Sequence, residues 1–364
     1  MTILYDDGQQ AIAREAGRVL AAKSDKAQLL GLLEQTGKYD EVFWQTAIEQ
    51  GWTGLALPEE HGGLGLGLIE LGIIAQACGT ATAGAPFLTS NYGAAQALQA
   101  GADETLQTHW LPRLAAGEAI GVVAFAEGND PLPAVPAVQF ANGALSGTKH
   151  GVAAGLTGDF AIVLAQSGGQ PAMVCAELAG AKREVVDSFD NSRLYAHLTF
   201  TGQPATLLAE GAPARSLAVD VLARMSVVAA HEQLGGAEAV MLMTRDYALE
   251  RRAFGQPIGA FQSVKHRIAE LYGLIEIARA NCLAAAALAG QEGFLRAAAA
   301  ARISSTEAYD TATRDGVQIH GGLGVTWEHG LHLHMRRARS LAIECGNLFV
   351  WEDLLARDLM GEVA

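Results

Sequence analysis

The stretch 250-ERRAFGQPIGAFQ-262 places a cationic helix end before an aromatic residue, a glycine, a proline-bearing turn and a glutamine. Arg251 can bind an anion, Phe254 offers an apolar face, and Gln262 can both donate and accept hydrogen bonds. The same cations would also be favourable near the carbonyl end of a helix that binds nothing. Residue chemistry alone therefore leaves two interpretations open, a helix terminus and an anion-binding corner.

A second glycine-rich stretch, 318-QIHGGLGVTWEH-329, lies nearer the C-terminus. Gly321 and Gly322 let a ligand approach the backbone closely, and amides at the start of a following helix favour a phosphate. Gln318 lies about one helical turn before them. This stretch is the second candidate for binding an anionic ligand.

Histidines and cysteines are the residue types that could hold a transition metal here. The histidines near the second stretch are at positions 320, 329, 332 and 334, and the four cysteines are at 78, 175, 282 and 345. The histidine spacings match no common ligand pattern, so we expect polar packing or surface positions. Because no CxxC spacing and no secretory signal pattern is present, we expect no metal and reduced thiols in a cytoplasmic protein.

The composition limits the function classes. The chain has 364 residues, of which 50% are hydrophobic and 18% are charged, and its formal charge is -14. This length suits two or three domains, and the composition favours tightly packed helices over disorder. An acidic chain is a poor general binder of nucleic acid or of an anionic membrane, although a local cationic pocket is compatible with it. No apolar run of about 18 residues predicts a membrane span.

The chain divides into a helical, a β-rich and a second helical segment. Residues 1–118 are mainly helical in pattern, and Asp40 is placed to cap one helix. Residues 119–205 hold short β-rich runs separated by Gly, Pro, Asn and Asp, which indicates a small all-β domain. Residues 206–364 return to helical spacing, with helices expected near 215–250, 262–290, 292–315 and 327–358. This order predicts an α+β fold with segregated segments.

The loop 62-GGLGLG-67 invites comparison with phosphate-binding loops. It does not follow a clear strand of a βαβ unit, and the GKS or GKT sequence is absent. We therefore expect a turn that lets two helices approach each other.

Three stretches together resemble the acyl-CoA dehydrogenase family of flavoproteins: 54-GLALPEEHGGLGL-66, 251-RRAFGQPIGAFQSVKHRIAEL-271 and 318-QIHGGLGVTWEH-329. They follow the order and distances of the family, and the resemblance covers essentially the whole chain. It implies an N-terminal helical domain, a middle small β-barrel-like domain and a C-terminal four-helix bundle, usually assembled as a tetramer. It also implies bound FAD, which takes a hydride from the acyl-CoA β-carbon while a carboxylate takes the α-proton, giving an enoyl-CoA. A desolvated carboxylate is a stronger base than one in water.

The resemblance assigns cofactor contacts to both motifs. The matching residues are Arg251, for the FAD pyrophosphate, Phe254 and Gln262 in the same site, and Gln318, Gly321 and Gly322 in a second FAD-contacting loop. In the family, both motifs reach across a subunit interface. They therefore imply an FAD that is cradled by a neighbouring subunit.

The part of the site that should hold this chain's own flavin departs from the family. Members usually have a Thr-Glu-Pro-Gly-type run around the flavin ring, whereas this chain has 124-AFAEGNDPL-132, which contains no hydroxyl. Members often have a Trp and a Thr just beyond it, where this chain has Gly151 and Ala153. This half of the site is expected to be degraded.

The position of the catalytic base also departs from the family. Counting from Gly321 without gaps places Cys345 where many members have a glutamate, and Glu344 one residue earlier. A thiol would need activation that nothing nearby supplies, so Glu344 is the candidate base. However, residues 333–355 have the pattern of one continuous helix, in which Glu344 would be ~100° out of phase.

A second family arrangement places the base on the first helix of the bundle. There this chain has Arg224 at the approximate position, and we take Arg224 as a candidate substrate-binding residue. Asp220 and Glu232 lie elsewhere on the same helix.

These observations lead to a preferred hypothesis and two alternatives. The preferred one is a subunit resembling the heteromeric acyl-CoA dehydrogenases of bacterial steroid or dicarboxylate catabolism, in which this chain completes an FAD site held by a partner that carries the base. The alternatives are a self-sufficient homotetramer that uses Glu344 or another carboxylate, and a non-catalytic scaffold subunit. The resemblance implies an electron-transfer flavoprotein as the electron acceptor. The sequence does not give the acyl chain.

Overall fold

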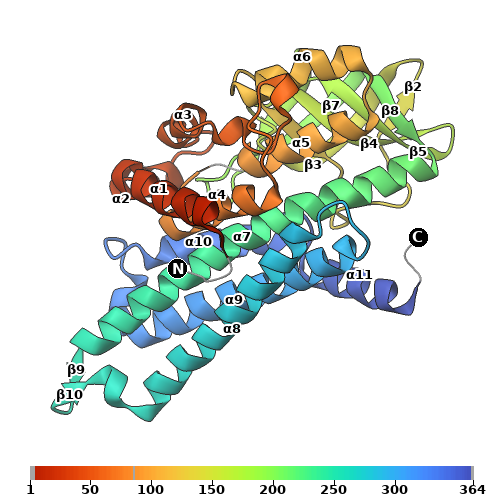
Figure 1. Ribbon diagram of the computed structural model, residues 1–364. Helices are drawn as coiled ribbons and strands as arrows, with labels where there is room; N and C mark the ends of the chain where they lie inside the picture. The colour runs from red at the N-terminus through yellow and green to blue at the C-terminus, as the bar shows by residue number, and fades with distance from the viewer. Residues whose placement is uncertain (1–4, 85–86, 362–364) are drawn as a thin grey trace. The chain divides into compact units, whose positions relative to one another are not determined.

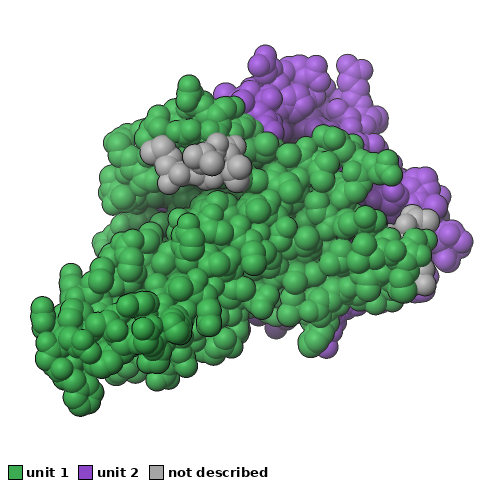
Figure 2. All heavy atoms as spheres, turned by 60° about the horizontal axis from the view of Figure 1, so that its bottom comes forward, with its two compact units in different colours: residues 1–30, 68–83, 226–363 green, residues 31–67, 84–225, 364 purple. Residues whose placement is uncertain are grey.

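The computed structural model describes residues 5–84 and 87–361, which form two compact units (Figure 2). Unit 1 lies within residues 1–30, 68–83 and 226–363, and unit 2 within residues 31–67 and 84–225. The expected division of the chain after residues 118 and 205 stays a prediction.

Unit 1 is helical. Its elements are α1 (Asp7–Lys23), the start of α2 (Lys26–Leu33), α4 (Leu68–Ala81), the later part of α7 (Ala212–Glu250), the short strands β9 (Arg252–Ala253) and β10 (Gln256–Pro257), the 3-10 turn η3 (Ile258–Ala260), α8 (Gln262–Ala287), α9 (Phe294–His320), the 3-10 segment η4 (Gly321–Val325), α10 (Leu331–Ile343) and α11 (Leu348–Met360). Figure 1 shows α8 and α9 running side by side. The helices expected near 215–250, 262–290 and 292–315 are therefore present, whereas the expected fourth helix is divided into α10 and α11.

Helices α4 and α7 approach each other closely at two glycines. A Cβ atom on Gly79 would lie 1.9 Å from the Glu232 carbonyl oxygen, and one on Gly235 would lie 1.9 Å from the Gln76 carbonyl oxygen. Only glycine fits at such distances, because any side chain would push the two backbones apart. The many small residues of the sequence thus serve close helix packing in unit 1.

Unit 2 contains the β-rich segment and the remaining helices. Its elements are α3 (Glu41–Glu49), η1 (Trp52–Gly54), η2 (Glu59–His61), α5 (Phe87–Gly101), α6 (Glu104–Ala115), β1 (Gly121–Ala124), β2 (Gln139–Ala141), β3 (Ala144–Ala153), β4 (Phe160–Ser167), β5 (Gln170–Glu177), β6 (Lys182–Val185), β7 (Tyr195–Pro204), β8 (Thr206–Glu210) and the first turns of α7. The strands form one sheet in the order β6-β7-β3-β2-β4-β5-β8, and β1 pairs with β4 in parallel. Together the elements confirm the predicted α+β class, with N-terminal helices, a middle sheet and C-terminal helices.

The core of unit 2 combines the sheet with helical side chains. Strand β4 is buried along most of its length, as the run 160-FAIVLA-165 predicts for a strand covered on both faces. Trp44 and Phe87 pack into the same cluster, with ring centroids 4.8 Å apart. Asp40 accepts a hydrogen bond from the Phe43 amide at 2.9 Å, so the expected cap of α3 is confirmed.

The stretch 62-GGLGLG-67 forms a turn that folds back on the residues before η2. The Leu64 amide donates to the Gly54 carbonyl at 2.9 Å, and the Gly65 amide donates to the Leu57 carbonyl at 2.9 Å. A Cβ atom on Gly63 would lie 2.1 Å from the Leu57 carbonyl oxygen. The glycines therefore serve a tight backbone turn. Among the described residues, no helix combines the length and the apolar character that a bilayer crossing requires.

Candidate functional site

The first of the two predicted cofactor motifs is a hairpin at the end of α7. The Arg251 amide still donates to the Tyr247 carbonyl at 2.8 Å, after which β9 and β10 pair antiparallel and the Ile258 amide donates to the Arg251 carbonyl at 2.8 Å. Phe254 and Gly255 take left-handed backbone angles at the tip, with φ of 51° and 82°. Figure 1 shows this hairpin joining α7 to α8.

The hairpin presents its functional side chains outward. Phe254 is 96% exposed, and its ring meets Phe261 edge-on at 6.2 Å between centroids. Arg251 and Gln262 are exposed as well. An almost fully exposed phenylalanine in a left-handed conformation is costly for a protein that keeps this surface in water. The hairpin has the properties of a surface that is covered by another molecule.

The second cofactor motif follows the end of α9. Gly321 has a φ of 59° and continues into η4, and Gln318 lies exposed on the last turn of α9. A Cβ atom on Gly321 or Gly322 would meet no atom within 4 Å, so the backbone here is open to a ligand. The Gly321 amide itself donates to the Val317 carbonyl, so what this segment offers a ligand is close approach to an unobstructed backbone.

A stack of aromatic rings connects the two motifs. The ring of His320, the residue before Gly321, lies on the ring of Tyr247 with centroids 4.4 Å apart and an interplanar angle of 22°. Tyr247 is the residue whose carbonyl accepts the Arg251 amide. The structure therefore brings the predicted cofactor residues of both motifs to one end of the α7 and α9 pair.

The other histidines near the second motif take part in packing. The rings of Trp327 and His332 stack at 4.7 Å, and the buried His334 is hydrogen-bonded through Nδ1 to the Tyr309 hydroxyl at 2.9 Å. Burial lowers the pKa of His334 to about 3, which keeps its ring neutral. Within the described ranges, no three His, Cys, Asp or Glu side chains are grouped as metal ligands would be.

The expectation of one continuous helix over 333–355 is wrong. Helix α10 ends at Ile343, Glu344 is extended, Cys345 has a φ of 60° and Gly346 a φ of 98°. Asn347 then caps α11 by accepting the Val350 amide at 3.2 Å. The phase argument against Glu344 therefore no longer applies, because the residue lies in a break rather than on a helix.

Buried side chains fix this break from two sides. The Arg302 guanidinium, 1% exposed on α9, donates to the carbonyls of Leu341, Glu344 and Gly346, with the Glu344 contact at 2.7 Å. The Trp351 indole donates to the Cys345 carbonyl at 3.0 Å. Carbonyls that a helix end leaves without partners are thereby satisfied, and Glu344 itself is 8% exposed. The break is a defined loop that contains both Glu344 and Cys345.

Two carboxylates on α7 that the sequence singles out, Asp220 and Glu232, are engaged in ion pairs. Glu232 lies 2.8 Å from the Arg337 guanidinium, and both side chains are buried. Asp220 lies 2.7 Å from Arg224, whose Nη1 also reaches the Tyr92 hydroxyl at 3.5 Å. Each of these two carboxylates is therefore committed to an arginine of this chain.

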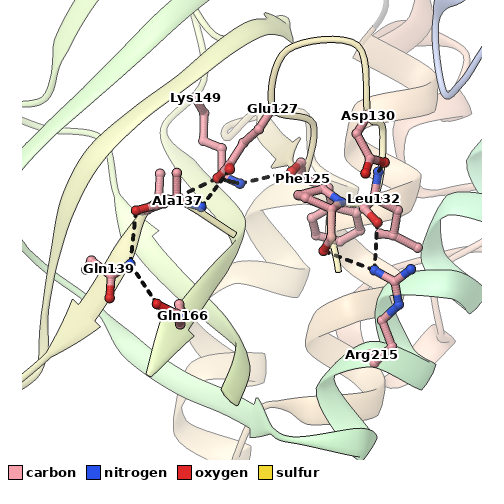
Figure 3. A network of polar contacts seen from close by, with 11 residues as sticks. Phe125, Glu127, Asp130, Leu132, Ala137, Gln139, Lys149, Gln166 and Arg215 are labelled. Atoms are coloured by element: carbon pink, nitrogen blue, oxygen red, sulfur yellow. Dashed lines mark hydrogen bonds and ion pairs between the residues drawn. The ribbon is translucent and has the colours of Figure 1, made fainter. Parts of the chain in front are cut away.

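The stretch that the resemblance assigns to the flavin ring is held by contacts with side chains of β3 and α7 (Figure 3). Glu127 lies 2.5 Å from Lys149 Nζ and accepts the Ala137 amide at 2.6 Å, while Lys149 also donates to the Phe125 carbonyl at 2.9 Å. Arg215 donates to the Leu132 carbonyl at 2.7 Å. The polar groups of this stretch thus serve to fasten the loop.

The position of the family's flavin-flanking aromatic residue is occupied by an exposed glycine. Gly151 has a φ of 61° and lies where the pairing register of β3 and β7 shifts, and its amide donates to His197 Nδ1 at 3.1 Å. A Cβ atom there would meet nothing within 4 Å. In this half of the site, the residues do not supply the hydroxyl and aromatic groups that the resemblance implies for a flavin ring, in contrast to the two motifs of unit 1.

Comparisons with known proteins identify the family that this chain resembles. Residues 6–118 match the acyl-CoA dehydrogenase N-terminal domain, and residues 216–360 match the acyl-CoA dehydrogenase C-terminal domain. The chain is 32% identical over 336 residues to acyl-CoA dehydrogenase IpdE2 of Mycobacterium tuberculosis, with 92% of each chain covered. Two solved structures are similar to the chain: a variant of the Tcur3481-Tcur3483 steroid ACAD, with a TM-score of 0.87, 25% identity and 98% of each chain covered, and the ChsE4-ChsE5 complex from Mycobacterium tuberculosis, with a TM-score of 0.89, 24% identity and 100% of each chain covered.

The fold and the two matching domain models thus indicate a family of flavoprotein oxidoreductases. The chain belongs to the acyl-CoA dehydrogenase family.

Proposed function

We propose that this chain is a subunit of an FAD-dependent acyl-CoA dehydrogenase, which converts an acyl-CoA thioester to the α,β-enoyl-CoA. In the assembled enzyme it completes an FAD site that is shared with a second, unlike acyl-CoA dehydrogenase chain. The outward presentation of both cofactor motifs at one end of unit 1 carries this proposal. The similarity to the Tcur3481-Tcur3483 steroid ACAD, which is named for two components, adds support.

The chain's own residues have binding and orienting roles in this proposal. Arg251 would pair with the cofactor pyrophosphate, because a guanidinium offers several donors in a fixed geometry. Phe254 would cover an apolar part of the cofactor, Gln262 and Gln318 would donate and accept hydrogen bonds, and the Gly321 and Gly322 backbone would allow close approach. Bound FAD supplies the capacity to accept a hydride, and the protein supplies orientation and electrostatics.

The partner would supply the flavin-ring cradle and the catalytic base. The stretch around Glu127 has no hydroxyl, and its carboxylate is committed to Lys149. Glu232 is committed to Arg337. Arg224 stays a candidate for substrate binding, since its guanidinium lies half-buried beside the Tyr92 hydroxyl.

The test is expression of this chain alone and together with the product of the neighbouring gene, followed by measurement of flavin absorbance and acyl-CoA oxidation. We expect flavin and turnover only in the two-chain preparation. Full flavin occupancy and turnover by the lone chain would contradict the shared site. We propose an electron-transfer flavoprotein as the natural electron acceptor and the cytoplasm as the location of the enzyme. An artificial electron acceptor lets the assay run without the electron-transfer flavoprotein.

A self-sufficient homotetramer is the second candidate, and one observation favours it. The break at residues 344–347 is a loop of the kind in which the family places its base, and Glu344 lies buried in it. In that case the lone chain would hold flavin and Glu344 would remove the α-proton.

A further inference from the structure

The two cofactor motifs come from different helices, so something must fix their relative position. Arg251 follows α7 and Gly321 follows α9, so the two motifs are separated along the chain by the whole of α8 and α9. A site that grips one cofactor at both motifs gains affinity when the two are already in place before binding. The contacts at the junction of the two helix ends therefore decide how well this site is preorganised.

The junction is a ladder of three rings in unit 1. Tyr247 stacks on His320 at 4.4 Å, and His320 meets His329 at 4.9 Å with an interplanar angle of 45°. His320 is 3% exposed, whereas both cofactor motifs on either side of it are exposed. The central ring of the ladder, His320, is the residue before Gly321. It packs on Tyr247, whose carbonyl accepts the Arg251 amide.

The orientation of the central ring is fixed by its own helix. His320 Nδ1 lies 2.7 Å from the Gly316 carbonyl oxygen. Because a carbonyl only accepts, Nδ1 carries the proton and donates. Gly316 also lets α7 come close, since a Cβ atom there would lie 2.8 Å from Val240 Cγ1. A single glycine thus provides both the acceptor for the ring and the helix approach that the stack needs.

We infer that His320 is a positioning residue that holds the two FAD motifs in register through its stack on Tyr247. The inference rests on the proposed function and deepens it, because it assigns a cofactor-related role to a buried histidine that lies between the two motifs. If the inference holds, loss of the ladder changes the affinity for FAD by more than any accompanying change in the stability of unit 1 explains.

The test compares His320→Ala, His320→Phe and Tyr247→Leu in the two-chain complex. His332→Ala is the matched control, because His332 stacks on Trp327 outside the ladder. We expect His320→Ala and Tyr247→Leu each to raise the FAD dissociation constant by about tenfold, and the double variant to add little more. His320→Phe keeps a ring and should restore affinity to within about threefold of the unaltered protein, while the control changes nothing.

A second measurement needs no flavin. Hydrogen exchange at the amides of residues 252–255 and 321–323 should become faster in both segments when His320→Ala is introduced into the lone chain, and should not change in the control. Unchanged FAD affinity in a complex that binds flavin, or a lower melting temperature with unchanged affinity and exchange, overturns the inference. An unaltered complex that binds no FAD overturns the proposed function instead, and the exchange result then still decides whether the ladder couples the two motifs.

Discussion

Lys149 Nζ lies 2.5 Å from Glu127 Oε1, and the lysine side chain is completely buried. Burial lowers the pKa of Lys149 to about 8. Burial alone would raise the pKa of Glu127, but hydrogen bonds from Lys149 and the Ala137 amide hold that pKa below its usual value. Both groups are therefore charged at neutral pH, and the pair joins strand β3 to the loop where the family holds a flavin ring.

Removing one partner of this pair should be costly. Lys149→Met leaves the Glu127 carboxylate without its cation, and we expect the free energy of unfolding to fall by ~3–5 kcal/mol. Urea denaturation followed by tryptophan fluorescence measures this change. Lys182→Met, which removes an exposed lysine of β6, is the control and should have little effect. Adding Glu127→Gln to Lys149→Met should recover part of the loss. A loss equal to the sum of the single changes would show that the two groups do not interact.

The sequence predicted this fold well because its signals are local. The buried strand β4, the Asp40 cap and the helices α7, α8 and α9 follow from apolar periodicity and capping chemistry. Strands β2, β6 and β8 were not predicted, because each is short and largely exposed and therefore lacks a clear alternating pattern.

The break after α10 was missed for a different reason. The apolar spacing continues through it, and the signals for an end are only Gly346 and the cap Asn347. What stabilises the break is Arg302, which lies on another helix and which sequence spacing does not connect to it. Tyr247 and His320 likewise meet only through the packing of α7 on α9. The predicted cofactor residues came from the family resemblance, whereas the contacts that position them are tertiary.

Arg251→Ala should remove flavin from the two-chain complex. Loss of a guanidinium that pairs with a pyrophosphate should weaken FAD binding by about 10- to 100-fold, because hydrogen bonds to charged groups contribute ~1.5–3 kcal/mol. Flavin absorbance after gel filtration, together with FAD titration, measures the effect. Arg245→Ala is a matched control, since Arg245 is also exposed on α7 but pairs with Asp246. A complex that keeps its flavin after Arg251→Ala would favour the scaffold alternative.

Glu344→Gln distinguishes the two catalytic candidates. Because we propose that the partner carries the base, kcat of the two-chain complex should stay within about twofold of the unaltered enzyme, whereas loss of a general base costs about 10²–10⁴-fold. Stopped-flow reduction of the flavin by an acyl-CoA measures the step directly, and flavin content serves as the control for assembly. A large loss of reduction rate with flavin still bound would assign the base to Glu344 and support the self-sufficient enzyme.

Stability should decrease on mild acidification because of two buried histidines. Burial lowers the pKa of His231 to about 4 and that of His334 to about 3, whereas both titrate near ~6.5 in an unfolded chain. Below pH ~6.5 the unfolded state therefore binds protons that the folded state refuses, so the free energy of unfolding falls as pH drops towards about 4. Each histidine contributes a slope of up to ~1.4 kcal/mol per pH unit.

His334→Gln can keep a hydrogen bond to Tyr309 but cannot titrate, and it should make the slope between pH ~6.5 and ~4.5 shallower in urea denaturation. His150→Gln, which replaces an exposed histidine, should leave the slope as it is. Equal slopes for the unaltered chain and for His334→Gln would mean that His334 is protonated in the folded state.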